Sequence, residues 1–290
     1  MTRRETPSIV EQEAEILAHE AHPGEQYVLR LRAPDVASQA RPGQFVHLRC
    51  GPCLPLRRPL SIQRTDPREG WIELLYKRVG AGTAALAEQP VGGRLPLLGP
   101  IGVPFRPDPR RPRVLLLGGG VGIPPMIFAA QWLRGRTPWK PLALLGSEVP
   151  FPFTPRPSRS SVSGLDGSRA AMPLLEDWGI PSRLASRAGL PGCHAGYVTE
   201  LAERWIAARG HAEDTQILAC GPHAMLKAVA ALACRHGLPC QVSLEEFMAC
   251  AVGGCAGCVV RVETPLGPAM QRVCVDGPVF DARAVFGPCA

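Results

Sequence analysis

Short apolar runs of alternating or β-branched character dominate the first third of the chain. Each run ends at a Pro, Gly or Asp. The runs occupy residues 14–21, 26–33, 44–50, 59–64 and 71–79. Closely spaced strands of this kind are typical of a small antiparallel barrel. We therefore expect a β-barrel domain over residues 1–108.

From residue 110 onward, strand-like and helix-like segments alternate. Strands are expected over residues 113–120, 141–148, 181–186 and 215–221. Helices are expected over residues 123–135, 173–179, 197–210 and 223–237. This alternation predicts a doubly wound parallel sheet with helices on its faces, over residues 109–240. Residues 150–169 are rich in Pro, Ser and Arg and are expected to form an exposed loop.

Length and composition indicate a globular protein of two or three domains. The chain has 290 residues, of which 46% are hydrophobic and 20% charged. Its net charge of +7 reflects either an arginine-rich composition or attraction to nucleotide phosphates or an acidic partner. No basic helix with interleaved aromatic residues is visible, which argues against nucleic acid. The first residues lack the apolar core of a signal peptide, and glycines and prolines interrupt the longest apolar stretch, so we expect a cytoplasmic, non-membrane protein.

Eleven cysteines are present, and four of them form a pattern. Cys250, Cys255 and Cys258 have the spacing C-x4-C-x2-C, and Cys274 follows after fifteen further residues. This is the spacing of plant-type [2Fe–2S] sites, in which small residues let backbone N–H groups point at the cluster. A zinc site also uses four thiolates, but usually as two close pairs, and only Cys255 and Cys258 make such a pair. Ordinary buried cysteines are the remaining alternative.

The other seven cysteines show no comparable pattern, and most are expected to be small buried side chains. They are Cys50, Cys53, Cys193, Cys220, Cys234, Cys240 and Cys289. A chain of this size needs no disulfide scaffold, which favours a reduced compartment.

Two segments of the expected barrel carry groups suited to phosphate. In residues 57–62 (RRPLSI) an arginine offers a fork of donors and a serine adds a hydroxyl, although a charged strand start is an equal alternative. In residues 76–83 (YKRVGAGT) the glycines let a loop approach a phosphate, and Thr83 can begin a helix whose amides bind anions.

Two segments of the expected sheet domain are suited to a dinucleotide. Residues 118–126 (GGGVGIPPM) lie between a strand and a helix, but their glycine spacing differs from G-x-G-x-x-G and no acid follows about twenty residues later. Close packing of strand and helix is therefore an alternative. Residues 219–225 (ACGPHAM) end another strand of the same sheet. Because ligands lie beyond the carboxyl ends of parallel strands, Gly119 and Cys220 should line one crevice.

Together these motifs resemble the ferredoxin–NADP reductase superfamily, in which R-x-x-S binds flavin, G-G-x-G-x-x-P binds pyridine nucleotide and C-G-P lies near the nicotinamide. They correspond here to Arg58 with Ser61, to residues 119–125 and to residues 220–222. Residues 42–46 (PGQFV) and 98–102 (LGPIG) also resemble that barrel. The segments RPLS, LYK, GT, EEFMAC and RVCVDGPVF further resemble the family of dihydroorotate dehydrogenase electron-transfer subunits.

This resemblance implies an NAD(P)-linked oxidoreductase of pyrimidine biosynthesis that relays electrons and has no acid–base catalytic residues. It implies FAD, a [2Fe–2S] cluster in a domain over residues 241–290, and a catalytic dehydrogenase subunit as heteromeric partner. The implied FAD contacts are Arg58, Pro59, Leu60, Ser61, Leu75, Tyr76, Lys77, Gly82 and Thr83. The implied nucleotide contacts are Gly119, Gly120, Gly122, Pro125, Cys220, Gly221 and Pro222.

The chain also departs from the family pattern. Ala251 stands where the family usually has Gly, and the 150–169 loop is longer than expected. Ser186 and Arg187 stand where the family has an acidic stretch. A serine and an arginine suit a ribose 2′-phosphate, so we predict that NADPH is tolerated or preferred. The alternative is that Arg187 is an ordinary surface arginine.

Two other functions stay open. The same relay can serve a hydrogenase, a sulfide dehydrogenase or a monooxygenase, because the fold does not fix the partner. The chain can also be a non-catalytic redox sensor or zinc module.

Overall fold

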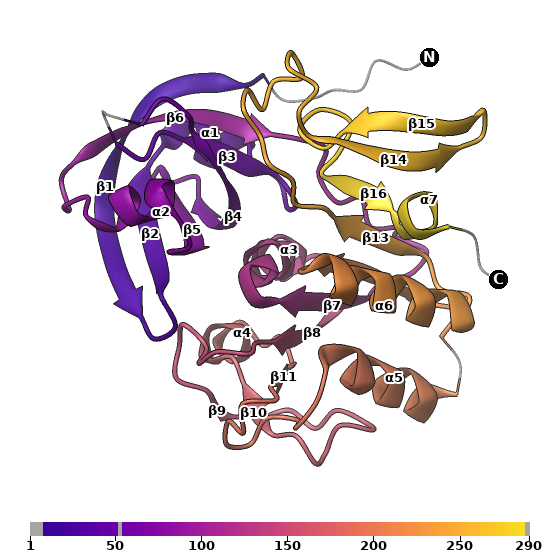
Figure 1. Cartoon of the computed structure of the whole chain (residues 1–290). Helices are drawn as coiled ribbons and strands as arrows, with labels where there is room; N and C mark the ends of the chain where they lie inside the picture. Colours follow the sequence, from indigo (N-terminus) through magenta and orange to yellow (C-terminus); the bar gives the residue numbers. More distant parts are fainter. Residues whose placement is uncertain (1–7, 52–53, 211, 288–290) are drawn as a thin grey trace.

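The computed structural model describes residues 8–51, 54–210 and 212–287. The first seven residues, Cys53 and Cys289 lie outside this part of the chain. Figure 1 shows the barrel, the sheet domain and a C-terminal hairpin region.

Six strands form a closed antiparallel barrel in the order β1-β2-β5-β4-β3-β6. Their bounds are β1 Val10–His22, β2 Gln26–Arg32, β3 Phe45–Leu48, β4 Arg58–Asp66, β5 Trp71–Lys77 and β6 Arg94–Ile101. Alternate side chains fill the interior, as Val46 and Leu48 of β3 and Leu74 of β5 illustrate. Two short helices, α1 Pro34–Gln39 and α2 Ala81–Ala87, accompany the barrel. The expected barrel is confirmed.

The second domain is a six-stranded sheet in the order β11-β8-β7-β12-β13-β16. All pairings are parallel except that of β16. The strands are β7 Arg113–Gly119, β8 Lys140–Gly146, β11 Ser182–Ala185, β12 Thr215–Cys220, β13 Cys240–Ser243 and β16 Val279–Asp281. The helices are η1 Gly120–Gly122, α3 Ile123–Leu133, α4 Pro173–Asp177, α5 Val198–Arg209 and α6 His223–Arg235. The expected doubly wound sheet is confirmed.

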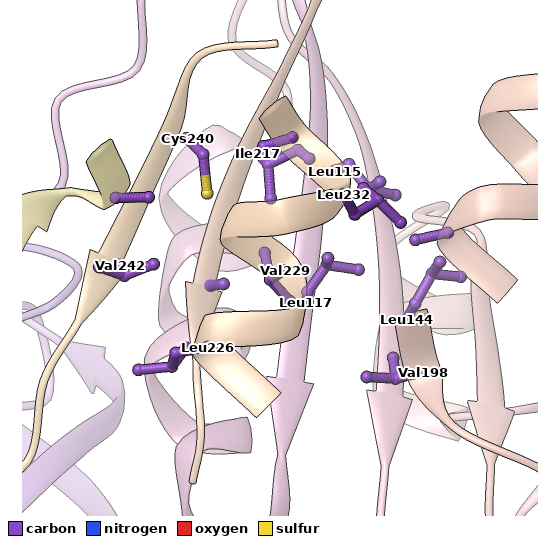
Figure 2. Close-up of a cluster of buried hydrophobic side chains, with 14 of the residues drawn as sticks. Leu115, Leu117, Leu144, Val198, Ile217, Leu226, Val229, Leu232, Cys240 and Val242 are labelled. Atoms are coloured by element: carbon purple, nitrogen blue, oxygen red, sulfur yellow. The ribbon is translucent and has the colours of Figure 1, made fainter. Parts of the chain in front are cut away.

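Helices cover both faces of this sheet because its strands are apolar on both sides. On β7, Leu115 and Leu117 pack with α5 and α6, whereas Val114 and Leu116 pack with α3 and α4. Figure 2 shows the first of these cores, where Val229 of α6 and Ile217 of β12 lie close to the β7 leucines. The sheet is thereby a rigid base for the loops at its carboxyl edge.

The segment with the four patterned cysteines lies between β13 and β16. It contains the hairpin β14 Val259–Thr264 and β15 Gly267–Arg272, and α7 Ala282–Phe286 follows β16. Ala251, Cys258 and Cys274 belong to the same buried cluster as Phe45 of β3. A hollow of about 340 Å³, lined in part by Gln44, Gly102 and Cys274, lies beside this contact between the segment and the barrel. The cysteine segment is therefore packed against both domains.

The 150–169 segment was expected to be an exposed loop, and this is only partly right. Strand β9 (Arg156–Pro157) pairs with β10 (Ala170–Ala171), and Val162 and Leu165 are buried. The buried Arg183 of β11 donates to the Ser160 carbonyl at 2.6 Å. The apolar anchors are irregularly spaced, so no period reveals them in the sequence.

Burial agrees with the expectation for most of the cysteines outside the pattern. Cys50, Cys220 and Cys240 are buried, and Cys193 and Cys234 are half-buried. In the described part of the chain no helix combines the length and the apolar character needed to span a membrane.

Candidate functional site

Arg58 and Gly82, two of the predicted flavin contacts, lie directly against each other. A Cβ atom on Gly82 would stand 2.4 Å from Nε of Arg58 and 2.7 Å from its Cζ. The Arg58 guanidinium also donates from Nη1 to the Leu56 carbonyl at 2.8 Å. Because Gly82 has no side chain, the guanidinium can lie directly against the start of α2, and the two residues form a small cationic cradle suited to a phosphate.

Thr83 shapes the loop that carries Gly82. Its Oγ1 accepts hydrogen bonds from the backbone N–H groups of Val79 at 2.9 Å and Gly80 at 3.2 Å. This is the side-chain half of a capping box, and it fixes where α2 begins. The hydroxyl therefore holds the loop in place beside Arg58.

The predicted contacts on β5 divide between two faces of the strand. Tyr76 points into the barrel, where it stacks on Tyr27 with ring centroids 5.2 Å apart and hydrogen-bonds His19 at 2.8 Å. Burial raises the pKa of its phenol. Leu75 is buried too, and strand alternation places it on the outer face of the barrel. On this strand Leu75, rather than the Tyr76 ring, faces the outer surface.

The predicted nucleotide segments meet at the carboxyl edge of the sheet. A Cβ atom on Gly122 would stand 2.4 Å from backbone atoms of Cys220 and Gly221. A Cβ atom on Gly119 would stand 2.3 Å from Sδ of Met225 and 3.3 Å from Pro222. Strands β7 and β12 pair in parallel and bring the two turns side by side. Their glycines allow the close approach that a dinucleotide crevice needs.

The flavin and nucleotide segments face each other. Strand β5 of the barrel contacts η1 of the glycine turn, and β4 contacts α3, which begins just after η1 and carries Pro125 in its first turn. Gln131 of α3 fastens the two domains, because it donates to the Thr65 carbonyl at 2.7 Å and accepts from the Thr65 amide at 3.1 Å. A flavin on the outer face of β4 and β5 and a nicotinamide at the glycine turn would therefore be neighbours.

Ser186 and Arg187 follow β11 at the same edge. Ser186 is buried, and its Oγ accepts from the Ala188 amide at 3.1 Å. Arg187 lies 4.8 Å over the Tyr197 ring and forms a two-bonded ion pair with Glu148, each bond 3.1 Å. Glu148 was not predicted as a site residue, because it follows β8 and lies beyond the usual spacing of a ribose-binding acid from the glycine turn. The Glu148 carboxylate neutralises the positive charge of Arg187, with which a 2′-phosphate would otherwise pair.

Cys250, Cys255 and Cys258 lie on the loop before β14, and Cys274 lies on the turn after β15. The Cys255 amide donates to Sγ of Cys250 at 3.4 Å, and Cys274 hydrogen-bonds Cys258. Backbone amides, foremost that of Val252, lower the pKa of the Cys250 thiol to about 6, whereas burial raises the pKa of Cys274 to about 12. Amides directed at a thiolate stabilise its negative charge, which is the donor environment of an iron–sulfur site.

The cysteine side chains make only local contacts with one another. Within the described ranges, no three or more Cys, His, Asp or Glu side chains surround one metal position. The contacts instead join Cys250 with Cys255 and Cys258 with Cys274. Each iron of a [2Fe–2S] cluster takes two thiolates beside the bridging sulfides, so four cysteines suffice for both irons.

The loop keeps this shape by using the left-handed region of backbone space. Ala251, Gly253 and Ala256 have φ of 57°, 83° and 52°. Arg272 closes the loop by donating to the Gly253 carbonyl at 3.2 Å and to Asp276. Ala251, where this chain departs from the family pattern, therefore has a backbone conformation that glycine adopts with less strain than alanine.

Comparison with known proteins gives consistent results. A family model described as the iron-sulfur cluster binding domain of dihydroorotate dehydrogenase B matches residues 245–286. A relative from Desulforamulus reducens, named dihydroorotate dehydrogenase B (NAD(+)), electron transfer subunit, is 33% identical over 261 residues, or 89% of this chain and 92% of that protein. The relative of the same name from Geobacillus thermodenitrificans is 36% identical, with the same coverage.

Solved structures show the same fold. A structure of an NADH-dependent reduced ferredoxin-NADP oxidoreductase, described in connection with flavin-based electron bifurcation, superposes with a TM-score of 0.76. It is 27% identical and covers 94% of this chain and 89% of its own. The ferredoxin reductase of carbazole 1,9a-dioxygenase, 23% identical with a TM-score of 0.60 over 80% of this chain and 67% of its own, shares the fold.

Proposed function

Because this chain belongs to the family of dihydroorotate dehydrogenase B electron transfer subunits, we propose that it relays electrons between a partner dehydrogenase and a pyridine nucleotide. The relay uses FAD and a [2Fe–2S] cluster, and it serves pyrimidine biosynthesis. The observation that carries the proposal is that residues 245–286, which match the cluster-binding family model, contain all four patterned cysteines.

The chain's own residues fit these cofactors. Arg58 and Gly82 form the cradle for FAD phosphates, and Ser61 lies three residues further along β4 on the expected path of the flavin. Cys250, Cys255, Cys258 and Cys274 supply two pairs of thiolates for two irons. When bound, FAD supplies the ability to exchange a hydride with nicotinamide and single electrons with an iron–sulfur cluster. The protein positions these groups and contributes no acid–base residue.

The nucleotide crevice lies between the Gly119 to Gly122 turn and the Cys220 to Pro222 turn. Its glycine amides and the start of α3 would hold the pyrophosphate, because a helix N-terminus favours anions. We propose NAD(H) as the nucleotide, since the Glu148 carboxylate is paired with Arg187 and disfavours an added phosphate. The expected role of Ser186 and Arg187 in binding a 2′-phosphate stays a prediction.

The catalytic dehydrogenase subunit is the proposed partner. Large apolar side chains are exposed on the cysteine loop and the β14–β15 hairpin, among them Phe247 at 96%, Leu266 at 100% and Met270 at 63%. Exposed large apolar side chains are typical of a protein interface. Cys255 is also exposed, which would bring the cluster within reach of the partner.

We also propose a cytoplasmic location, because the cluster thiols must stay reduced to bind iron. Functionally the chain divides at residues 1–108, 109–240 and 241–290. The last unit contributes β16 and most of β13 to the edge of the sheet.

Reconstitution tests the function. The purified chain is combined with a dihydroorotate dehydrogenase catalytic subunit, dihydroorotate and NAD⁺, and NADH formation is followed by absorbance. NADH should form only when both subunits are present, and Cys255→Ser should abolish it while FAD stays bound. NADH formation by the Cys255→Ser variant at the wild-type rate would contradict the proposal.

A second partner has one specific observation in its favour. The structure of the NADH-dependent reduced ferredoxin-NADP oxidoreductase, 27% identical, superposes over 94% of this chain with a TM-score of 0.76. The same relay in another flavoenzyme complex is therefore the second candidate. Co-purification with a subunit other than a dihydroorotate dehydrogenase would favour it.

A further inference from the structure

The turn between β1 and β2 reaches from the barrel to the sheet domain (Figure 1). Gln26, at the end of this turn, is only 4% exposed, and its side-chain amide donates to the Pro150 carbonyl at 2.7 Å. The same amide donates to the carbonyl of Pro23, within the turn, at 2.8 Å. Pro150 belongs to residues 147–150, the β8 loop, which follows β8 at the carboxyl edge of the sheet. One buried amide therefore ties the barrel to the β8 loop.

The tip of this turn has a shape that fits the β8 loop. Gly24 and Glu25 have φ of 78° and 59°, in the left-handed region that residues other than glycine rarely adopt. Arg78 holds Glu25 there, because it pairs with the Glu25 carboxylate and its amide donates to the Glu25 carbonyl at 2.8 Å. A Cβ atom on Gly24 would lie 2.9 Å from Cβ of Val149, so the missing side chain lets the valine pack against the turn. The turn therefore contacts the β8 loop through packing as well as through the Gln26 hydrogen bond.

The β8 loop carries Glu148 directly before the two residues that contact the turn, Val149 and Pro150. On the other side of Glu148, the Ser147 hydroxyl donates to the Val149 carbonyl at 2.7 Å. The Ser147 amide donates to the Ala185 carbonyl of β11 at 3.1 Å. The backbone of Glu148 is therefore fixed from both sides, by the sheet through Ser147 and by the barrel through Pro150.

The ion pair between Glu148 and Arg187 depends on this fixed backbone. The side chains of Glu148 and Arg187 are 66% and 52% exposed. An ion pair open to water contributes little by itself, because ordering two long side chains costs entropy. A loop that is already fixed lowers this entropic cost. Since Arg187 is the predicted contact of a ribose 2′-phosphate, the strength of the ion pair sets the preference between NADH and NADPH.

We propose that Gln26 is a positioning residue for nucleotide specificity. It fixes the β8 loop so that Glu148 stays paired with Arg187, and the site thereby favours NADH over NADPH. Gln26 acts through Glu148 rather than on the nucleotide itself. A residue of the barrel thus tunes the specificity of a site in the sheet domain. The inference rests on the proposed function, because it deepens the choice of NAD(H) as the nucleotide.

Steady-state oxidation of NADH and NADPH by the full-length holoprotein, with ferricyanide as electron acceptor, tests the proposal. Gln26→Met keeps the length of the side chain but loses both hydrogen-bond donors. It should lower the KM for NADPH roughly two- to fivefold, the worth of an exposed ion pair, because Arg187 is freed. The KM for NADH and both kcat values should not change, since the reacting nicotinamide lies at the other end of the nucleotide. A merely structural defect would not improve the use of NADPH.

Two further variants show whether Gln26 acts through Glu148. Gln131→Met removes the other glutamine that joins the two domains, at Thr65, and should leave the KM for NADPH unchanged. The double variant Gln26→Met with Glu148→Gln should equal Glu148→Gln alone, because both changes free the same arginine. If Gln26→Met does not fold, Val149→Ala, which loosens the packing on the turn, should lower the KM for NADPH in its place.

An unchanged KM for NADPH in the folded Gln26→Met protein would overturn the proposal, and in its absence the same result for Val149→Ala would do so. An equal decrease in Gln131→Met, or additive effects in the double variant, would also overturn it. These results leave the proposed function intact as long as the wild type oxidises NADH. A wild type that oxidises neither nucleotide would instead refute the proposed function itself.

Discussion

Replacing Gly122 by alanine should distort the nucleotide crevice. The added Cβ would lie 2.4 Å from the carbonyl carbon and oxygen of Cys220 and from the Gly221 nitrogen. Ordinary contacts between heavy atoms are about 3.5–4.0 Å, so the two turns must separate by roughly 1 Å. Overpacking costs about 1–3 kcal/mol, and the upper end applies because backbone atoms cannot rotate away. A loss of about 3 kcal/mol lowers the unfolding temperature by roughly 6–12 °C.

Gly119→Ala is the matched control in the same turn. Its Cβ would meet Sδ of Met225 at 2.3 Å, but this is the end of a flexible side chain, and the extended backbone at Gly119 accepts alanine. Circular dichroism gives the unfolding temperatures, and titration gives the NADH dissociation constants. Gly122→Ala should lose more stability and more NADH affinity than Gly119→Ala. The reverse order, or a Gly122→Ala protein equal to the wild type in both measurements, would refute the crevice geometry.

Three further predictions concern other parts of the molecule. Burial alone would raise the pKa of the Glu73 carboxyl, but hydrogen bonds, foremost from Arg64, hold it below its usual value. Glu73→Gln should therefore lower the free energy of unfolding in urea by about 3 kcal/mol at pH 7. The difference from the wild type should shrink as the pH falls below about 4, because the stabilisation is lost when the Glu73 carboxylate becomes protonated in the folded protein. Ala251→Val should lose the cluster absorbance, because a β-branched residue rarely adopts φ of 57°, whereas Ala251→Gly should keep the cluster and a stability within about 1 kcal/mol of the wild type. Glu148→Gln should raise the ratio of NADPH to NADH oxidation rates by freeing Arg187, and an unchanged ratio would remove that arginine from the nucleotide site.

The barrel and the sheet could be predicted because their strands carry period-two or continuous apolar patterns between clear breaks. The register in which the strands pair could not be predicted in the same way. Opposed positions such as His47 and Pro59 depend on how strands pair, which a single sequence does not encode locally. The sequence showed a histidine in a strand, and only the fold revealed that its ring is buried.

The candidate site could be predicted where the spacing of residues along the chain is typical of a known kind of binding site. The C-x4-C-x2-C run led to four cysteines that lie together, and two glycine-rich turns led to one crevice. Pairings between distant residues were missed. Glu148 and Arg187 follow different strands, and only the parallel pairing of β8 with β11 places them side by side.

Iron and acid-labile sulfide analysis of the anaerobically purified chain tests the central claim most directly. The account predicts about two irons and two sulfides per chain, with no zinc, and the loss of both in Cys255→Ser. Zinc in place of iron, or iron without sulfide, would contradict it.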